Sequence, residues 1–313
     1  MKRYSVILML LAAVLSVGCK DSKNKADATQ QAPEVRHWPY FDGNYPMVVT
    51  TDSARMEYLC RHSWDTFDFS DTLALRNDTS EVLTEFAGFI QTINYYGGND
   101  KPAIIEQLIA KASTSRTMLE YFAWQAREVL ADPNSPIRND ELYIPVVRGM
   151  LATGFYNFAE RTRLEYKLDI MLKNRIGHKA NDFTYTLESG RKSVLYGLRS
   201  DFVLIFFNNP GCPMCREVRE ELRTSELVSN MVNDGSLTIL AMYPDEEVDD
   251  WLEHKAEFPT SWICAYDNGC KIRGGALYDV SAIPSLYLLD KDKTVLLKDI
   301  TDVKLLEETL AAH

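Results

Sequence analysis

The stretch FVLIFF, from Phe202 to Phe207, is apolar at six consecutive positions. Successive side chains of a strand point to opposite faces of its sheet, so this strand needs an apolar layer on each face. Pro210-Gly211 breaks the run, and an amphipathic segment follows with Val218 and Leu222 at helical spacing. The stretch therefore predicts the central strand of an α/β sheet and a helix that packs on it.

The periodicity of the apolar residues changes near Gly177. From about Thr50 to Ile176 they recur at spacings of three and four, which is typical of helices. After Gly177, short apolar runs alternate with amphipathic segments, which is typical of strands and helices in turn. We therefore predict an all-helical domain over 38–176 and an α/β domain with a mixed sheet over 177–313, since 313 residues are more than one typical domain.

Turn signals set the expected limits of the elements. In the first part we expect helices over 52–64, 80–95, 102–111, 115–130, 140–150 and 156–176. In the second part, a strand–turn–strand stretch from Asp182 leads into strands over 202–207, 237–242, 286–289 and 294–298. The helices expected there cover 215–231, 247–255 and 303–312.

The N-terminus has the anatomy of a secretory signal: a basic start, an apolar run from Val6 to Val17 and a small residue before Cys19. The apolar run is shorter than the roughly 20 residues of a membrane span. LSVGC, ending at Cys19, resembles a bacterial lipobox, with Ser16 where an aliphatic residue is usual. The resemblance implies a signal peptide over 1–18, a lipid on Cys19, a flexible tether over 19–37 and an anchored place in the periplasm or at the cell surface; simple secretion is the alternative.

Charge and compartment narrow the possible functions. The formal net charge is -11, and the chain has no long basic run, so nucleic acid is not an expected partner. An exported chain meets oxidising conditions in which disulfides persist. Its cysteines are therefore candidates for disulfide chemistry.

Cys212 and Cys215 form a Cys-Pro-Met-Cys motif directly before the predicted helix. A helix N-terminus carries unpaired N–H groups and partial positive charge, so it stabilises a thiolate, which is the nucleophile in thiol exchange. Pro213 suits the first helical position. A redox pair is thus favoured over a structural disulfide or half of a zinc site, for which Cys264 and Cys270 would have to supply two further ligands.

The order of a DFTYTLESG strand, FVLIFF, CPMC at a helix start, AIPSLYLLDKD and VLLKDI resembles exported thioredoxin-like domains of the TlpA and ResA type, over roughly 179–313. The resemblance implies that Cys212 is the nucleophile and Cys215 the resolving cysteine. It also implies that Pro284 is a cis-proline facing the pair and that Ile283 offers backbone groups to an extended substrate, with Pro213 beside them. No cofactor or metal is implied beyond the cysteine pair.

The chain departs from that family at two positions. Gly211 replaces the usual tryptophan before the first cysteine, and Phe206 stands where thioredoxin has an acidic residue. A peroxidase of the peroxiredoxin type is disfavoured, because Asn209 occupies the position where it needs a hydroxyl group. The upstream run HSWDTFDFSDTLALR resembles the start of an uncharacterised helical domain that precedes thioredoxin-like domains in bacterial lipoproteins.

The remaining cysteines carry weaker signals. Cys264 and Cys270 flank the turn-prone Asp-Asn-Gly segment, so an accessory disulfide and two separate thiols are both open. Cys60 lies on the apolar stripe of a helix and is expected to be a buried, inert thiol. We thus expect an envelope thiol-disulfide oxidoreductase that exchanges disulfides with protein substrates and with a redox partner protein; the alternative is a lipoprotein scaffold with a structural CxxC.

Overall fold

The computed structural model describes residues 38–41, 43–73 and 75–313. The described residues belong to one compact unit. The expected signal peptide, lipidated Cys19 and tether lie outside the described residues. Within the described ranges, no helix has the length and apolar character needed to cross a bilayer.

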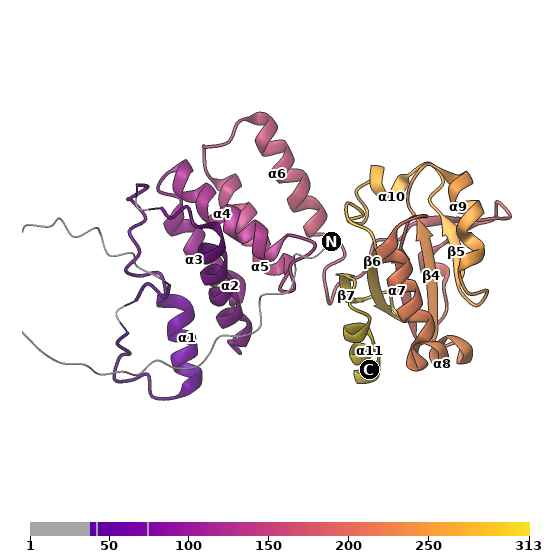
Figure 1. Cartoon of the computed structure of the whole chain (residues 1–313), viewed down its shortest axis with the longest axis horizontal. Helices are drawn as coiled ribbons and strands as arrows, with labels where there is room; N and C mark the ends of the chain where they lie inside the picture. Colours follow the sequence, from indigo (N-terminus) through magenta and orange to yellow (C-terminus); the bar gives the residue numbers. More distant parts are fainter. Residues whose placement is uncertain (1–37, 42, 74) are drawn as a thin grey trace, which may run out of the picture. The chain divides into compact units, whose positions relative to one another are not determined.

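The first part of the described chain is helical, as predicted, and is coloured indigo to magenta in Figure 1. Its helices are α1 (Asp52–His62), α2 (Thr79–Tyr95), α3 (Lys101–Ala112), α4 (Arg116–Leu130), α5 (Asp140–Ala152) and α6 (Phe158–Met171). The helix predicted over 156–176 is wrong at both ends. Asn157 caps the start of α6 and Leu172 caps its end, so 172–176 is not helical. Asn157 and Glu160 form a reciprocal capping box, which fixes the start.

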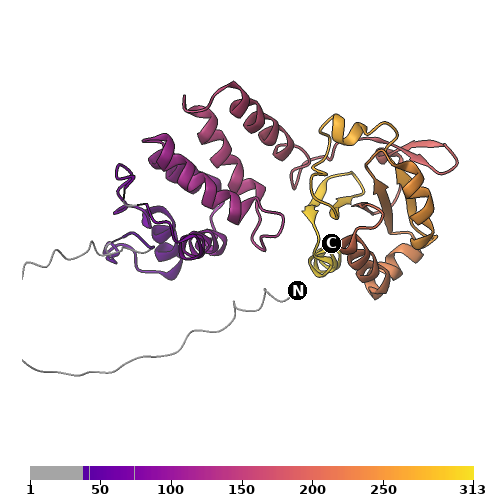
Figure 2. The same cartoon turned by 45° about the horizontal axis from the view of Figure 1, so that its top comes forward.

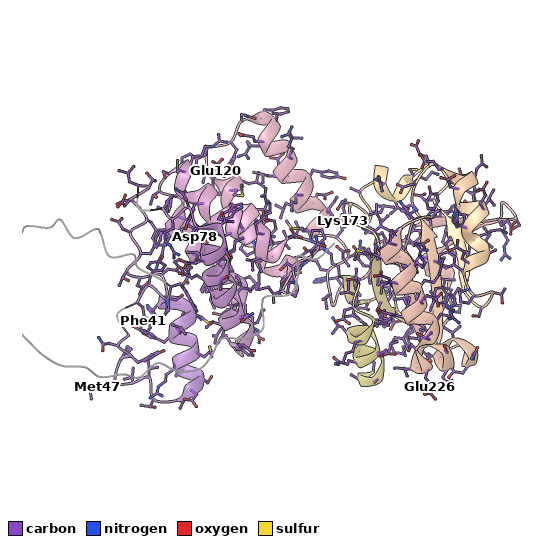
Figure 3. The ribbon with its side chains drawn as sticks, in the orientation of Figure 1. Phe41, Met47, Asp78, Glu120, Lys173 and Glu226 are labelled. Carbon is purple, nitrogen blue, oxygen red and sulfur yellow. The ribbon has the colours of Figure 1, made fainter. Side chains whose placement is uncertain are left out.

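The helices enclose one apolar core. The Trp64 ring meets those of Phe89 and Phe122 edge to face there, with centroids 5.5 and 5.1 Å away. At Gly149 a β-carbon would lie 2.3 Å from Ile109, so the glycine permits the close packing of α5 on α3. At the rim, the Phe41 ring lies 6.3 Å from that of Tyr58 on α1 (Figure 3).

The second part holds a seven-stranded mixed sheet, which confirms the predicted fold class. Its strands are β1 (Thr184–Leu187), β2 (Lys192–Val194), β3 (Phe202–Phe207), β4 (Leu237–Tyr243), β5 (Ile263–Tyr266), β6 (Ser285–Asp290) and β7 (Val295–Ile300). Their order is β2-β1-β5-β4-β3-β6-β7, with β3, β4 and β5 parallel and the other pairs antiparallel. Figure 2 shows the β1–β2 hairpin at one edge.

Both faces of the sheet are covered, as the apolar β3 requires. The helices of this second part are α7 (Pro213–Thr224), α8 (Glu226–Asp234), α9 (Val248–His254), α10 (Lys271–Gly274) and α11 (Val303–Ala312), with short 3₁₀ turns η1 (Leu195–Gly197) and η2 (Lys255–Glu257). Leu204 and Phe206 pack with α7, α8 and α11 on one face. Val203, Ile205 and Phe207 pack with η1 and α10 on the other.

Two predictions for this part need correction. The helix expected over 215–231 is two helices, because Ser225 adopts an extended conformation that ends α7, while its hydroxyl accepts from Val228 N at 3.1 Å and begins α8. β5 and α10 were not predicted. β5 has only four residues and ends directly before the Asp-Asn-Gly turn, so its apolar run is too short to predict a strand.

The register of the central strands positions the site. Phe207, the last residue of β3, pairs with Met242 of β4 and with Ser285 of β6. Because β6 runs antiparallel to β3, the segment before Ser285 and the loop after Phe207 meet at the same edge of the sheet. This edge brings Pro284 close to the Cys-Pro-Met-Cys motif.

Candidate active site

Cys212 is the N-cap residue of α7, as the sequence predicts. Its Sγ accepts a hydrogen bond from the backbone N–H of Cys215 at 3.2 Å, and Pro213 is the first helical residue. The side chain is partly exposed. The Cys212 sulfur is thus held against the N–H groups of a helix start, and the thiolate is the form of cysteine that attacks a disulfide.

Cys215 lies one turn further into α7 and is 5% exposed. Burial, followed by the hydrogen bond with Cys212, raises the pKa of its thiol to about 12. The two thiols thus differ as attack and resolution require: Cys212 is accessible, whereas Cys215 is protected and protonated until a mixed disulfide forms.

The Ile283–Pro284 peptide bond is cis and faces the motif. The Cys212 Sγ lies 3.8 Å from the carbonyl oxygen of Ile283, to which its thiol can donate. The structure therefore brings together four of the predicted site residues: the two cysteines, Ile283 and Pro284. Pro213 lies beside them at the start of α7.

The backbone conformation at position 211 explains why this chain has Gly211 where the exported thioredoxin-like domains usually have a tryptophan. Its φ is +72°, in the left-handed region where an L side chain is strained. The turn is closed by the Cys212 N–H, which donates to the Asn209 carbonyl at 3.4 Å. This backbone conformation favours glycine over a tryptophan at the position.

Phe206 shows what replaces the strand carboxylate. It is fully buried, and its ring lies 6.3 Å from that of Phe258. Hydrocarbon therefore occupies this position beside Cys215 in the core.

The Glu257 carboxylate, from η2, reaches the site. A cavity of about 120 Å³ beside Cys215 is lined by Asn209, Arg219 and Glu257, among others. The Arg219 guanidinium lies 5.0 Å from the centre of the Phe258 ring and 2.7 Å from Glu257 Oε2. Arg219 Nε and Asn209 Oδ1 are buried and have no hydrogen-bond partner among the described residues, so the cavity has the volume and the polar groups that suit a bound water.

Glu257 and Arg219 were missed by the sequence analysis. Arg219 lies four residues after Cys215, a spacing that places both on one face of the helix, and this was the available signal. Glu257 lies in η2, beyond β4 and α9, and its approach depends on how that connection folds.

Comparison with known proteins identifies both parts of the chain. A family model described as a domain of unknown function, DUF5106, matches residues 18–174. The crystal structure of a thioredoxin-like protein from Bacteroides caccae is 38% identical over 86% of this chain and 97% of its own, with a TM-score of 0.81. The chain belongs to the DUF5106 family and to the thioredoxin-like proteins.

Two further solved structures match less than half of this thioredoxin-like protein. The C-terminal domain of an uncharacterised protein from Bacteroides fragilis is 46% identical over 44% of this chain and 98% of its own, with a TM-score of 0.43. The thioredoxin domain of a thiol-disulfide oxidoreductase from Bacteroides vulgatus is 21% identical over 44% and 96%, with a TM-score of 0.39. No curated protein matches the chain.

Cys264 and Cys270 are not bonded to each other in this thioredoxin-like protein. Cys264 lies in β5 and packs against the core that contains Cys215, and burial raises the pKa of its thiol to about 11. Cys270 adopts a left-handed conformation before α10. Within the described ranges, no cluster of three or more His, Cys, Asp or Glu residues is placed to bind a metal ion.

Proposed function

We propose that this thioredoxin-like protein is a thiol-disulfide oxidoreductase of the cell envelope that acts on protein thiols or disulfides. The observation that carries the proposal is the placement of Cys212: at the N-cap of α7, partly exposed, and 3.8 Å from the carbonyl of Ile283 beside cis-Pro284. A scaffold has no need of an accessible thiol in this position. The signal-like N-terminus supports export, and the lipobox-like LSVGC supports anchoring through Cys19.

In the reducing direction, the Cys212 thiolate attacks one sulfur of a substrate disulfide. The S–S bond of the substrate breaks, one substrate thiolate leaves, and a mixed disulfide forms on Cys212. Cys215 then loses its proton and attacks Cys212 Sγ, which releases the second substrate thiolate. The substrate gains two electrons and the Cys212–Cys215 pair loses two; the reverse sequence oxidises a dithiol. The cysteine pair itself is the redox group, so the chemistry needs no further cofactor.

The test is to trap the mixed disulfide. In Cys215→Ser the resolving thiol is gone, so we expect Cys212 to retain envelope proteins as adducts that dithiothreitol releases. Mass spectrometry of adducts from envelope extracts would identify the partners. Cys212→Ser is the matched control and should retain none. If both variants capture the same proteins, or neither captures any, the chain is better described as a scaffold with a structural CxxC.

A further inference from the structure

A cleft of about 540 Å³ lies beside the cis-proline, within the roughly 300–1,000 Å³ typical of binding clefts. Ala282 and Pro284 line it from the loop that faces Cys212. The turn between β7 and α11 lines it with Thr301 and Asp302. The other wall comes from the helical region, through the connection between α4 and α5 and through Ile176.

A partly buried ion pair fixes this helical wall to the sheet. The Lys298 Nζ lies 2.9 Å from Asp140 Oδ2, and their side chains are 8% and 18% exposed. The same ammonium donates to the carbonyls of Met171 and Lys173, at 2.9 and 3.0 Å; Lys173 is labelled in Figure 3. β7 thus holds both the start of α5 and the end of α6.

A second link reaches the cis-proline loop itself. Arg138, in the helical wall, donates to Asp299 Oδ2, and the Ser285 hydroxyl donates to Asp299 Oδ1 at 2.6 Å. Ser285 is fully buried and directly follows Pro284. One side of the cleft is therefore hydrogen-bonded, through one carboxylate, to the loop on the other side.

These contacts show what the cleft can bind. The charged lining groups are engaged: Arg138 with Asp299, Lys298 with Asp140, Glu141 with Arg175, and Asp302 with the first N–H groups of α11. The exposed lining surface includes apolar side chains, with Ile176 58% and Leu305 40% exposed, and the exposed Pro133 and Pro136. Such a surface suits apolar side chains on an extended chain better than a charged ligand.

We propose that the helical region forms a substrate-specificity wall: it binds apolar side chains next to the reactive cysteine of a protein substrate. This inference rests on the proposed function. A segment joined to Cys212 by a disulfide passes Ile283 and Pro284, and the cleft begins at Pro284. The wall acts on substrate choice, while the cysteines carry the chemistry.

The test compares three substrates in single turnovers of the pre-reduced full chain. One is 5,5′-dithiobis(2-nitrobenzoate), which has no peptide. The others are thionitrobenzoate mixed disulfides of a five-residue peptide whose central cysteine is flanked by leucines or by serines. We expect the leucine peptide to react about tenfold faster than the serine peptide, because partial burial of a leucine stabilises the complex enough for a tenfold difference in rate.

Ile176→Arg and Pro136→Arg place a charge in the wall without touching the cysteine site or the ion pairs. Each should lower the rate with the leucine peptide about tenfold and leave the peptide-free disulfide within about twofold. Tyr95→Arg, at another exposed position of the helical region, is the matched control and should change neither.

The proposal is overturned if the wild type does not distinguish the two peptides, or if the wall variants slow all three substrates equally. An unchanged rate with the leucine peptide in both wall variants overturns it too. Failure of the proposed function looks different: the peptide-free disulfide would then react equally well with Cys212→Ser.

Discussion

Cys60 of the helical region and Cys212 of the sheet region lie in opposite environments. Cys60 of α1 is 1% exposed in an apolar core, and burial raises the pKa of its thiol to about 11. Cys212 of the sheet region caps a helix, is partly exposed and lies 3.8 Å from the carbonyl oxygen of Ile283. The same chemical group is therefore inert in one region and positioned for exchange in the other, and the difference lies in the backbone that holds it.

Alkylation tests this difference between Cys60 and Cys212 most directly. With the reduced protein at neutral pH, we expect iodoacetamide to modify Cys212 at least about a hundredfold faster than Cys60, since the thiolate is the reactive form and Cys60 is both buried and protonated. Mass spectrometry of the labelled peptides measures both rates. Cys60→Ser should leave the fast phase intact and Cys212→Ser should remove it; similar rates at the two sites would contradict the contrast.

The partly buried Lys298–Asp140 pair tests how far the two regions depend on each other. Lys298→Met leaves the Asp140 carboxylate and two carbonyls without their donor, so we expect the free energy of unfolding to fall by about 3 kcal/mol. Urea denaturation measures the change. Lys304→Met is the matched control, because its pair with Glu308 is exposed and should contribute less than about 0.5 kcal/mol.

A double variant tests whether the loss comes from the uncompensated Asp140 charge. Adding Asp140→Asn to Lys298→Met removes the uncompensated charge and should recover part of the loss, and comparison with both single variants gives the coupling between the two side chains. A loss no larger than that of Lys304→Met would mean that the pair does not hold the two regions together.

The sequence was sufficient for features that are local in the chain. The apolar β3, the helix that starts at Pro213 and the cysteine at its N-cap each follow from a few consecutive residues. The approach of Pro284 to Cys212 was available only through a family resemblance, because it depends on the pairing of β3 with β6.

Features built from distant segments could not be read in the same way. Glu257 reaches the cavity beside Cys215 from a 3₁₀ turn with no distinctive pattern. The wall around Pro136 meets Pro284 because paired charges dock it on β7, and the sequence does not show which charges will pair. Patterns of a few residues thus predicted the reacting groups, while the groups that surround them required the structure.

Each region also holds an arginine between an aromatic ring and a carboxylate, which supplies a matched pair for the last test. Arg219 lies over Phe258 and pairs with Glu257, and Arg116 lies over Tyr156 and pairs with Glu160. Only the first of these arginines lines the cavity that contains Cys215. We therefore expect Glu257 to assist the loss of the Cys215 proton and Glu160 to have no such effect.

The reaction to follow is the release of thionitrobenzoate from Cys212 by Cys215. Because the pKa of the Cys215 thiol is raised to about 12, its thiolate fraction grows about tenfold per pH unit below that value, and an unassisted rate grows equally steeply. A carboxylate that accepts the proton makes the dependence shallower. Glu257→Gln should thus slow release about fivefold near pH 7 and steepen its rise between about pH 6 and pH 9. Glu160→Gln, which preserves the capping box of α6, should match the wild type; an unchanged rate and slope in Glu257→Gln would show that Cys215 passes its proton directly to solvent.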